Sequence, residues 1–226
     1  MSLTVRPLSH ALGAEIAGVD LAKPLSNAEF DQIHRTFLEK GILLFRDQEI
    51  TREQHIAFSR RFGELDNHES LPRDRHPDYP ELLLVTNVPK ENGKPSDSKY
   101  TGQQWHSDLS FTPVPSLGSL LRGITIPPVG GDTMFTNMYR AYDTLSDGMK
   151  KMIADLHGIH TGSRKIVDLS SDRAVEQRKL NPPIAQPVVR VHPETCRRRR
   201  RPSRRYRAPC GRSPDGRARR AGRSAG

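Results

Sequence analysis

Cysteine is missing from most of this 226-residue sequence. The two cysteines, Cys196 and Cys210, both lie near the C-terminal end, so residues 1–195 can form neither a disulfide framework nor a thiolate metal site. Long hydrophobic runs are also missing. The longest one near the N-terminus, Ile42 to Phe45, is far too short to cross a bilayer. We therefore expect a cytoplasmic protein that has no membrane partner.

Residues 196–226 contain no lysine and no Ile, Leu, Val, Met, Phe or Trp, but they contain 13 arginines. With a single acid, Asp215, this segment carries a charge of +12, which leaves about −2 for residues 1–195 out of a total of +10. A segment without large apolar side chains cannot bury a core. The sequence therefore predicts one domain over residues 1–195, which is not basic, followed by a disordered arginine-rich tail over 196–226.

The tail has two interpretations. Arg, Ala, Gly, Pro and Ser make up 27 of its 31 residues, and most of these are amino acids that a GC-rich gene yields when it is read out of frame. Our hypothesis is a frameshift near Thr195, because an extended pattern is interrupted there and a natural basic arm usually also contains lysine. The alternative is an arm that binds nucleic acid through its arginines. Under the favoured hypothesis no nucleic-acid partner is expected.

Two capping boxes predict helices in the N-terminal part. Ser26 with Glu29 precedes apolar residues at helical spacing and predicts a helix over residues 27–40. Thr51 with Gln54 opens a second helix. The expected ends of the two helices are Gly41 and Gly63.

Short extended segments and long polar loops make up most of the remaining chain. Further helices are predicted over residues 139–156 and 170–180. Strands are predicted within residues 3–22 and at residues 42–45, 82–86, 120–126, 133–136 and 188–191. Few long helices and many short strands favour an α+β or all-β barrel or sandwich over a parallel βαβ sheet.

Two His-x-Asp triplets are candidate metal ligands. Side chains at positions i and i+2 of a strand lie on one face, so His106 and Asp108 could supply two ligands of a facial triad on iron(II). The other triplet, His76 and Asp78, has a central proline within a polar loop, which indicates a turn. A hydrolytic metal site at His106 and Asp108 is a weaker alternative, because no clear third ligand or general base accompanies them.

Short motifs recur along the chain on either side of His106. They lie at residues 18–21, 44–48, 61–65, 105–111, 127–135, 181–183 and 187–193. In composition and in order, these motifs resemble those of the taurine and 2,4-dichlorophenoxyacetate dioxygenase family. The similarity covers roughly residues 4–195.

The resemblance implies an α+β fold with a double-stranded β-helix (jelly-roll) core and flanking helices. It also implies that His106 and Asp108 bind Fe(II) and that Thr133 hydrogen-bonds a carboxylate of the co-substrate 2-oxoglutarate. The expected reaction uses O2 to hydroxylate a small organic acid, which is a sulfonate, a sulfate ester or a carboxylate, and its co-products are succinate and CO2. No residue is assigned as a catalytic acid, base or nucleophile. Family members also form homo-oligomers.

Some family features have no counterpart in this sequence. The resemblance implies a distal histidine as third iron ligand and an arginine for the far carboxylate of 2-oxoglutarate, and no segment matches either. We therefore expect an incomplete jelly-roll and an inactive chain. His192 is predicted to be a solvated histidine at a strand end, and the tail arginines lack a strand that could direct one at a carboxylate.

The substrate is less well indicated than the co-substrate. Sulfonate-specific members of the family place a histidine shortly after the Phe-Gly-Glu-Leu motif, whereas here Asp66 follows it, so taurine is not favoured. Asn67, His68 and Arg73 are candidate residues of a lid over the site. An alternative to an enzyme is a catalytically dead barrel with a basic tail that binds nucleic acid.

Overall fold

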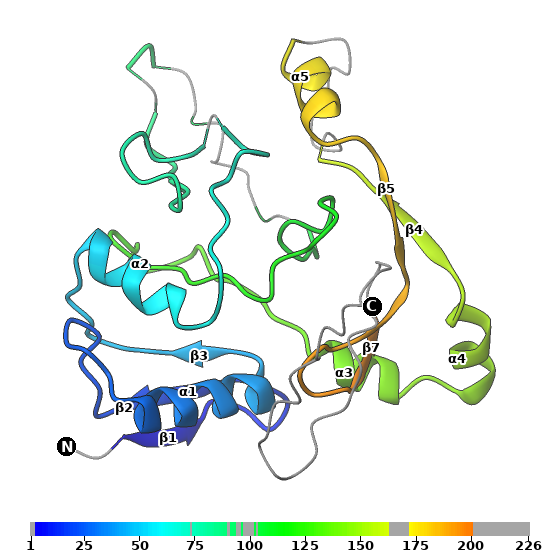
Figure 1. Ribbon diagram of the computed structural model, residues 1–226, viewed down its shortest axis with the longest axis horizontal. Coiled ribbons are helices and arrows are strands. Elements are labelled where there is room, and N and C mark those ends of the chain that lie inside the picture. The colour runs from blue at the N-terminus through cyan, green and yellow to red at the C-terminus, as the bar shows by residue number, and fades with distance from the viewer. Residues whose placement is uncertain are drawn as a thin grey trace, which may run out of the picture.

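Helices and strands are mixed in the computed structural model, which agrees with the predicted α+β class. Figure 1 shows an N-terminal unit in blue and cyan, a two-stranded ribbon in yellow and orange, and a long irregular segment between them. The structure describes residues 3–72, 74–89, 91–93, 96, 102, 104–162 and 172–200.

The N-terminal sheet has three short strands. Strand β1 (Thr4–Pro7) pairs antiparallel with β2 (Ala14–Ala17), and β2 pairs in parallel with β3 (Leu43–Leu44). The strands predicted within residues 3–22 are confirmed. The predicted buried strand at residues 42–45 is reduced to two half-buried residues, because only Leu43 and Leu44 find partners on β2.

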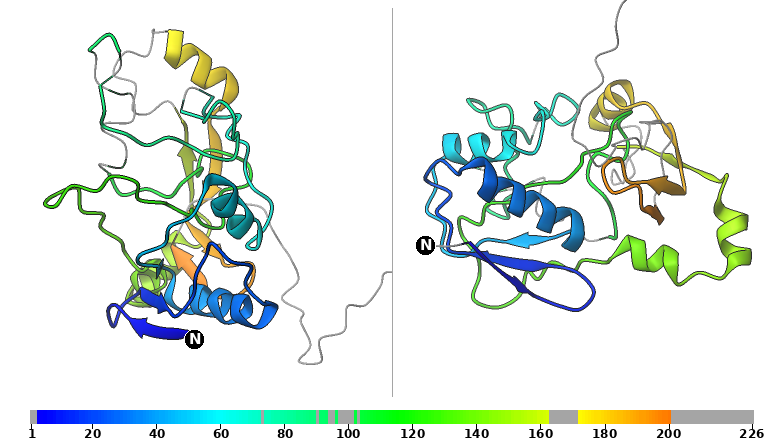
Figure 2. Two further views of the ribbon diagram at one scale, coloured as in Figure 1. Left: turned by 90° about the vertical axis from the view of Figure 1, so that its left-hand side faces the viewer. Right: turned by 60° about the horizontal axis from the view of Figure 1, so that its bottom comes forward.

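The first helix, α1 (Asn27–Lys40), has the predicted bounds. The Ser26 side chain accepts a hydrogen bond from the Glu29 backbone N–H, and the Glu29 carboxylate accepts one from the Ser26 backbone N–H at 2.8 Å. The helix ends at Gly41, whose φ of 73° is a left-handed conformation that glycine adopts without strain. Figure 2 shows α1 lying against one face of the sheet.

The second helix, α2 (Arg52–Arg60), also begins at its predicted capping box. Thr51 accepts from the Gln54 backbone N–H at 3.2 Å, and Gln54 accepts from the Thr51 backbone N–H at 2.7 Å. The helix ends at Arg60, which is slightly before the predicted end at Gly63.

The N-terminal unit contains the main hydrophobic core of the described residues. Ile33 is fully buried and Ile16 is 2% exposed. Phe62, which follows α2, meets Phe30 of α1 edge to face, with 5.0 Å between the ring centres. The buried members of the core are Ile16, Leu21, Phe30, Ile33, Ile50 and Phe58.

One glutamine ties the loops at the edge of this core together. Gln48 Oε1 accepts from the Leu21 backbone N–H at 2.8 Å. Its Nε2 donates to the carbonyl oxygens of Val19 (3.3 Å) and Arg46 (2.9 Å). Gln48 thereby joins two of the sequence motifs, at residues 18–21 and 44–48, through the backbone.

The long segment over residues 61–137 has no helix or strand in its described part, apart from an isolated bridge between Arg75 and Leu83. The strands predicted at residues 82–86, 120–126 and 133–136 are therefore wrong. The reason is that a strand needs a neighbour for its backbone hydrogen bonds, and among the described residues the Arg75–Leu83 bridge is the only strand-like pairing that these segments make.

Two short helices replace the single helix predicted over residues 139–156. Helix α3 (Met138–Asp143) and helix α4 (Asp147–Ile153) are separated by a short turn. The Ser146 side chain accepts from the Met149 backbone N–H at 3.2 Å, which caps α4 and starts a new helix.

A two-stranded ribbon follows these helices. Strand β4 (His157–His160) pairs antiparallel with β5 (Ile184–Pro187), and helix α5 (Asp172–Leu180) lies between them in sequence. The described part of the predicted helix over residues 170–180 is confirmed, whereas residues 170 and 171 lie outside the described residues.

The last ribbon joins the arginine-rich segment to the domain. Strand β6 (Val189–Val191), which confirms the predicted extended segment at residues 188–191, pairs antiparallel with β7 (Arg198–Arg200). The disordered tail over residues 196–226 stays a prediction, although the backbone of residues 198–200 pairs with β6. Residues 201–226 lie outside the described part of the chain.

The described strands form one sheet of three strands and two sheets of two. The predicted jelly-roll core, incomplete at the C-terminus, stays a prediction, because a barrel needs more paired strands than these. No helix in the described part of the chain is both long enough and apolar enough to span a membrane.

The Ser26→Ala variant tests the capping box of α1. The substitution removes the side-chain acceptor of the Glu29 N–H, and we expect the free energy of unfolding to fall by about 1 kcal/mol. Urea denaturation followed by far-ultraviolet circular dichroism measures this. Ser116→Ala is the control, since the Ser116 side chain makes no hydrogen bond among the described residues. Equal stability of the two variants would contradict the role of the cap.

The Tyr79→Phe variant tests a pH-dependent tie between α2 and the loop that follows it. The Tyr79 hydroxyl donates to the Glu53 carboxylate and lowers the pKa of Glu53 from its ordinary value of 4.5 to about 2. Because the folded-state pKa is the lower one, this bond stabilises the protein above pH 4.5 and loses its effect as the pH falls towards 2. We expect the variant to be less stable than the parent at neutral pH and equally stable near pH 2. Urea midpoints across this range test it, and a pH-independent difference would refute it.

Candidate metal centre

The structure brings His106 and Asp108 together, as predicted, although no strand carries them. His106 Nε2 lies 3.3 Å from Asp108 Oδ1, and the two side chains are 48% and 52% exposed. The described residues around them form turns. The chain changes direction at Leu109, whose φ of 49° is a left-handed conformation that is uncommon outside glycine. The predicted pair is therefore present on a backbone of a different shape.

Two hydrogen bonds determine which atoms of the pair face each other. His106 Nδ1 lies 2.7 Å from the carbonyl oxygen of Gln104. Since a carbonyl only accepts, Nδ1 carries the hydrogen, and Nε2 of the neutral ring keeps its lone pair. Ser119 Oγ donates to Asp108 Oδ2 at 2.6 Å, while Asp108 Oδ1 faces the histidine. In the neutral form of the ring, two electron-rich atoms face each other, and a cation bound by both would stabilise this arrangement; in the protonated form, the ring and the carboxylate make an ion pair.

The distance between these atoms fits joint ligation of a metal ion. Two ligand bonds of about 2.1 Å that meet at a right angle place the ligating atoms about 3.0 Å apart. The observed separation of His106 Nε2 and Asp108 Oδ1 is 3.3 Å. An imidazole nitrogen and a carboxylate oxygen are two of the three donors of an iron(II) facial triad. His106 and Asp108 therefore fit two of the three ligand positions of such a site.

A third ligand does not join the pair within the described residues. No group of three His, Cys, Asp or Glu side chains there could hold a metal ion. With about half of each side chain exposed, the pair is also open to water. Two ligands on an exposed turn bind a divalent ion weakly compared with a closed three-ligand site.

Ser119 was not predicted from the sequence, although it contacts one of the two ligands. Its neighbour Leu120 packs against the N-terminal core. The backbone of Leu120 is also hydrogen-bonded to His55 of α2. Burial lowers the pKa of His55, and the hydrogen bond to Leu120 partly opposes this lowering. The segment that ends in Ser119 is therefore anchored to the N-terminal unit. A serine eleven residues after an aspartate is not a recognisable motif, so the sequence carried no signal for this contact.

Thr133, the predicted 2-oxoglutarate contact, is exposed and lies outside any helix or strand. It lies two residues after Gly131, and Gly130 and Gly131 have φ angles of 83° and 76°, a left-handed conformation that glycine adopts without strain. No hydrogen bond among the described residues joins the Thr133 side chain to His106 or Asp108. The role of Thr133 stays a prediction.

The second triplet forms a structural turn, as its sequence indicated. His76 is buried, and its Nδ1 accepts a hydrogen bond from the Asp78 backbone N–H at 3.1 Å. The His76 ring also meets Tyr79 edge to face at 5.1 Å. Its side chain is therefore used within the loop.

The prediction of a solvated His192 is wrong. His192 is 5% exposed. Its Nδ1 accepts from the backbone N–H groups of Glu194 (3.2 Å) and Thr195 (3.3 Å), so the ring organises the turn between β6 and β7. The buried position follows from this turn, which the sequence pattern did not reveal. His192 is accordingly not a candidate for the missing ligand.

Two of the three candidate lid residues lie in the described part of the chain. The His68 ring is tied to its own loop, because its Nε2 lies 3.1 Å from the carbonyl oxygen of Glu81. Asn67 lines a shallow hollow of about 460 Å³ together with Arg60 and Glu81. Arg73 lies outside the described residues.

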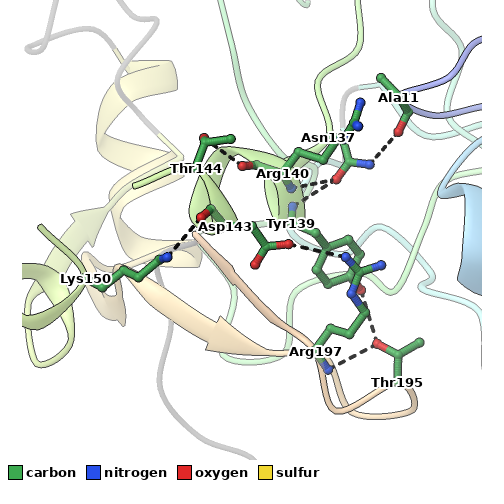
Figure 3. A network of polar contacts seen from close by, with 9 residues as sticks. All are labelled: Ala11, Asn137, Tyr139, Arg140, Asp143, Thr144, Lys150, Thr195 and Arg197. Carbon is green, nitrogen blue, oxygen red and sulfur yellow. Dashed lines mark hydrogen bonds and ion pairs between the residues drawn. The ribbon is translucent and has the colours of Figure 1, made fainter. Parts of the chain in front are cut away.

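One tail arginine has a defined place. Figure 3 shows Arg197 beside α3. Its guanidinium lies 4.3 Å from the centre of the Tyr139 ring, and its Nη2 is 3.5 Å from Asp143 Oδ2. The hydroxyl groups of Tyr139 and Thr195 lie 3.4 Å apart. This contact does not test the prediction that no tail arginine is directed at the far carboxylate of 2-oxoglutarate, because Asp143 is a carboxylate of the protein itself.

A family model described as "Taurine catabolism dioxygenase TauD, TfdA family" matches residues 4–221. The chain belongs to this family. The matched range continues beyond Thr195, where the resemblance was expected to end.

Individual members of the taurine catabolism dioxygenase family are similar over most of this chain. The alpha-ketoglutarate-dependent 2,4-dichlorophenoxyacetate dioxygenase of Cupriavidus pinatubonensis is 32% identical over 203 residues, which are 85% of this chain and 70% of that protein. A putative alpha-ketoglutarate-dependent sulfonate dioxygenase of Schizosaccharomyces pombe is 31% identical over 84% of this chain and 48% of its own length. The crystal structure of AAD-2 in complex with Mn(II) and N-oxalylglycine has a TM-score of 0.71 at 31% identity and covers 88% of this chain and 70% of that chain.

The Ser119→Ala variant tests the support of Asp108. Loss of the hydrogen bond to Oδ2 frees the carboxylate to rotate away from His106, so we expect Mn(II) affinity to fall by roughly 10-fold to 100-fold. Electron paramagnetic resonance of free Mn(II) measures binding. Ser116→Ala is the matched control, since this nearby serine makes no side-chain hydrogen bond among the described residues. An unchanged affinity in Ser119→Ala would exclude the supporting role.

Proposed function

We propose that this chain derives from a 2-oxoglutarate-dependent dioxygenase that hydroxylates a small organic acid with Fe(II) held by His106 and Asp108. The observation that supports this most directly is the pair of lone-pair-bearing atoms, 3.3 Å apart, on the motif that the family membership singles out. When bound there, the metal supplies the redox chemistry that couples oxidation of 2-oxoglutarate to succinate and CO2 with hydroxylation of the substrate by O2.

The residues of this chain have a positioning task in that reaction. Gln104 and Ser119 hold the two ligands so that His106 Nε2 and Asp108 Oδ1 are available on the same side. We assign Thr133 as the donor to a carboxylate of 2-oxoglutarate, because it lies two residues after Gly131 in the family motif at residues 127–135. A hydroxyl group suits this task, since it donates one hydrogen bond to a carboxylate without adding charge.

The 226-residue chain by itself is proposed to be inactive. Among the described residues only two ligands come together, and both are about half exposed. A distal histidine and an arginine for the far carboxylate have to be added to complete the site, together with the strands that close the jelly-roll. The oxidation also needs a site from which bulk water is excluded, and the exposed pair of His106 and Asp108 does not provide one.

The arginine-rich segment is proposed to be a frameshift product that begins near Thr195. The composition of residues 196–226 supports this, because 13 arginines and no large aliphatic residue do not suit barrel strands. The start of the segment still fits the domain, as the contacts of Arg197 show. A change of frame within or just after the β6–β7 turn is consistent with both observations.

The substrate is proposed to be a small organic acid that carries a carboxylate, a sulfonate or a sulfate ester. The names of similar proteins support this class, since they include a phenoxy-acid dioxygenase and a sulfonate dioxygenase. Asn67 remains a candidate for the lid because it lines the hollow beside Arg60. His68 is a weaker candidate, since its ring is bonded within the loop. A cytoplasmic location stays part of the proposal.

A catalytically dead domain with a nucleic-acid-binding tail is the competing function. The charge of +12 on residues 196–226 favours it. The contacts of Arg197 with Asp143 and Tyr139 count against nucleic-acid binding by this arginine, because its guanidinium is already engaged within the protein. Binding to DNA or RNA that falls steeply with salt, and disappears when residues 201–226 are deleted, would favour this function over the enzyme.

Succinate formation from 2-oxoglutarate with added Fe(II) tests the proposed function. Three proteins are compared: the 226-residue chain, a version whose reading frame is restored after Thr195, and the restored version with His106→Ala. We expect turnover only in the restored version without the substitution, because His106 supplies one of the ligands. Turnover by the 226-residue chain would show that a third ligand exists within it, and a restored version without turnover would contradict the proposal.

A further inference from the structure

A buried amide side chain on β5 contacts the turn that follows Asp108. Gln186 is fully buried. Its Nε2 donates to the carbonyl oxygens of Ser110 (3.2 Å) and Thr112 (2.8 Å), which lie 76 and 74 positions earlier in the sequence. A single side chain thus holds two backbone groups of one turn.

The turn held by Gln186 begins at a strained residue. Leu109 is buried and has a φ of 49°, although a leucine side chain disfavours this conformation. The Leu109 carbonyl oxygen accepts from both the backbone N–H (3.1 Å) and the hydroxyl (2.8 Å) of Thr112. Such a conformation persists only where surrounding contacts hold it in place. Because Leu109 directly follows Asp108, the same contacts help to fix the direction of the Asp108 backbone.

The partner strand of Gln186 supports the same turn. His160 on β4 has its Nδ1 3.0 Å from Ser110 Oγ. In the ribbon, Gly158 of β4 lies opposite Gln186 of β5. Both strands therefore reach the segment after Asp108, whereas Ser119 reaches the carboxylate itself from the N-terminal side.

The orientation of the Gln186 amide is determined by its donor role. If the amide were reversed, its oxygen would face two carbonyl oxygens, which repel it. In the observed orientation the Gln186 Oε1 atom is buried and has no hydrogen-bond partner among the described residues. A buried acceptor without a partner is unfavourable. The hydrogen bonds that Nε2 donates to Ser110 and Thr112 therefore hold the amide in this orientation.

We propose that Gln186 is a positioning residue for the metal pair, acting through residues 109–112. This inference rests on the proposed function, since it assumes that His106 and Asp108 ligate a metal ion. Without the two N–H donors, Leu109 can relax to an ordinary conformation. Relaxation turns Asp108 and increases the separation between Asp108 Oδ1 and His106 Nε2, which is now 3.3 Å.

The Gln186→Met variant removes both donors while keeping a side chain of similar length. Gln48→Met is the matched control, because Gln48 also bonds two backbone carbonyls and one N–H but lies in the N-terminal unit. Two measurements are made on the 226-residue chain. One is Mn(II) affinity by electron paramagnetic resonance, and the other is amide hydrogen exchange of the metal-free protein by mass spectrometry.

In Gln186→Met, Mn(II) affinity is expected to fall by about 10-fold to 100-fold. Exchange in peptides that contain residues 109–112 is expected to rise by about 10-fold while exchange in α1 stays unchanged. Gln48→Met is expected to lose stability in the N-terminal unit and to keep the parental Mn(II) affinity. A general loss of structure would accelerate exchange in α1 as well, which separates unfolding from a local effect.

Four outcomes decide between the proposals. Parental Mn(II) affinity in Gln186→Met would overturn the positioning role, as would an equal loss of affinity in Gln48→Met. If the parental chain binds no Mn(II), the metal centre of the proposed function is wrong. In that case amide hydrogen exchange alone tests whether Gln186 holds the turn. Unchanged exchange of residues 109–112 in Gln186→Met would show that it does not.

Discussion

The arrangement of His106 and Asp108 depends on one constraint: both residues lie on irregular backbone that has no ladder of hydrogen bonds to hold it. Helices and sheets fix side-chain directions through repeated backbone bonds, whereas a loop needs separate contacts for each change of direction. Here those contacts come from three sides. Gln104 orients the imidazole, Ser119 holds the carboxylate, and Gln186 holds the turn that follows.

These contacts also connect the two packed parts of the molecule. Ser119 precedes Leu120, which packs against the N-terminal core, and Gln186 belongs to the β4–β5 ribbon. Figure 1 shows the two parts on either side of the irregular segment. His106 and Asp108 therefore lie on a segment that is fixed only while both parts keep their structure. A change in the ribbon can reach the pair without any direct contact with its ligands.

Much of the N-terminal unit could be predicted from the sequence, because its signals are local. The capping boxes at Ser26 and Thr51 lie within four residues of the atoms they bond, and both helices begin where predicted. The pairing of His106 with Asp108 was also predictable from close spacing and the family motif. Ser119 and Gln186 were not, since their bonds cross 11 and more than 70 residues and follow no repeat. The strand predicted at residues 120–126 failed for a related reason, as a strand depends on a partner elsewhere in the fold.

The unpaired segment after Leu120 has a consequence for the life of the chain in a cell. Leu121, Ile124 and Val129 are 80%, 79% and 87% exposed. Exposed apolar residues on extended backbone are what molecular chaperones hold and what quality-control proteases degrade, and they also promote aggregation. The amount of this polypeptide that accumulates in a cell then depends on the balance between chaperone binding and proteolysis. Degradation of the chain therefore limits its abundance, whether or not it has enzymatic activity.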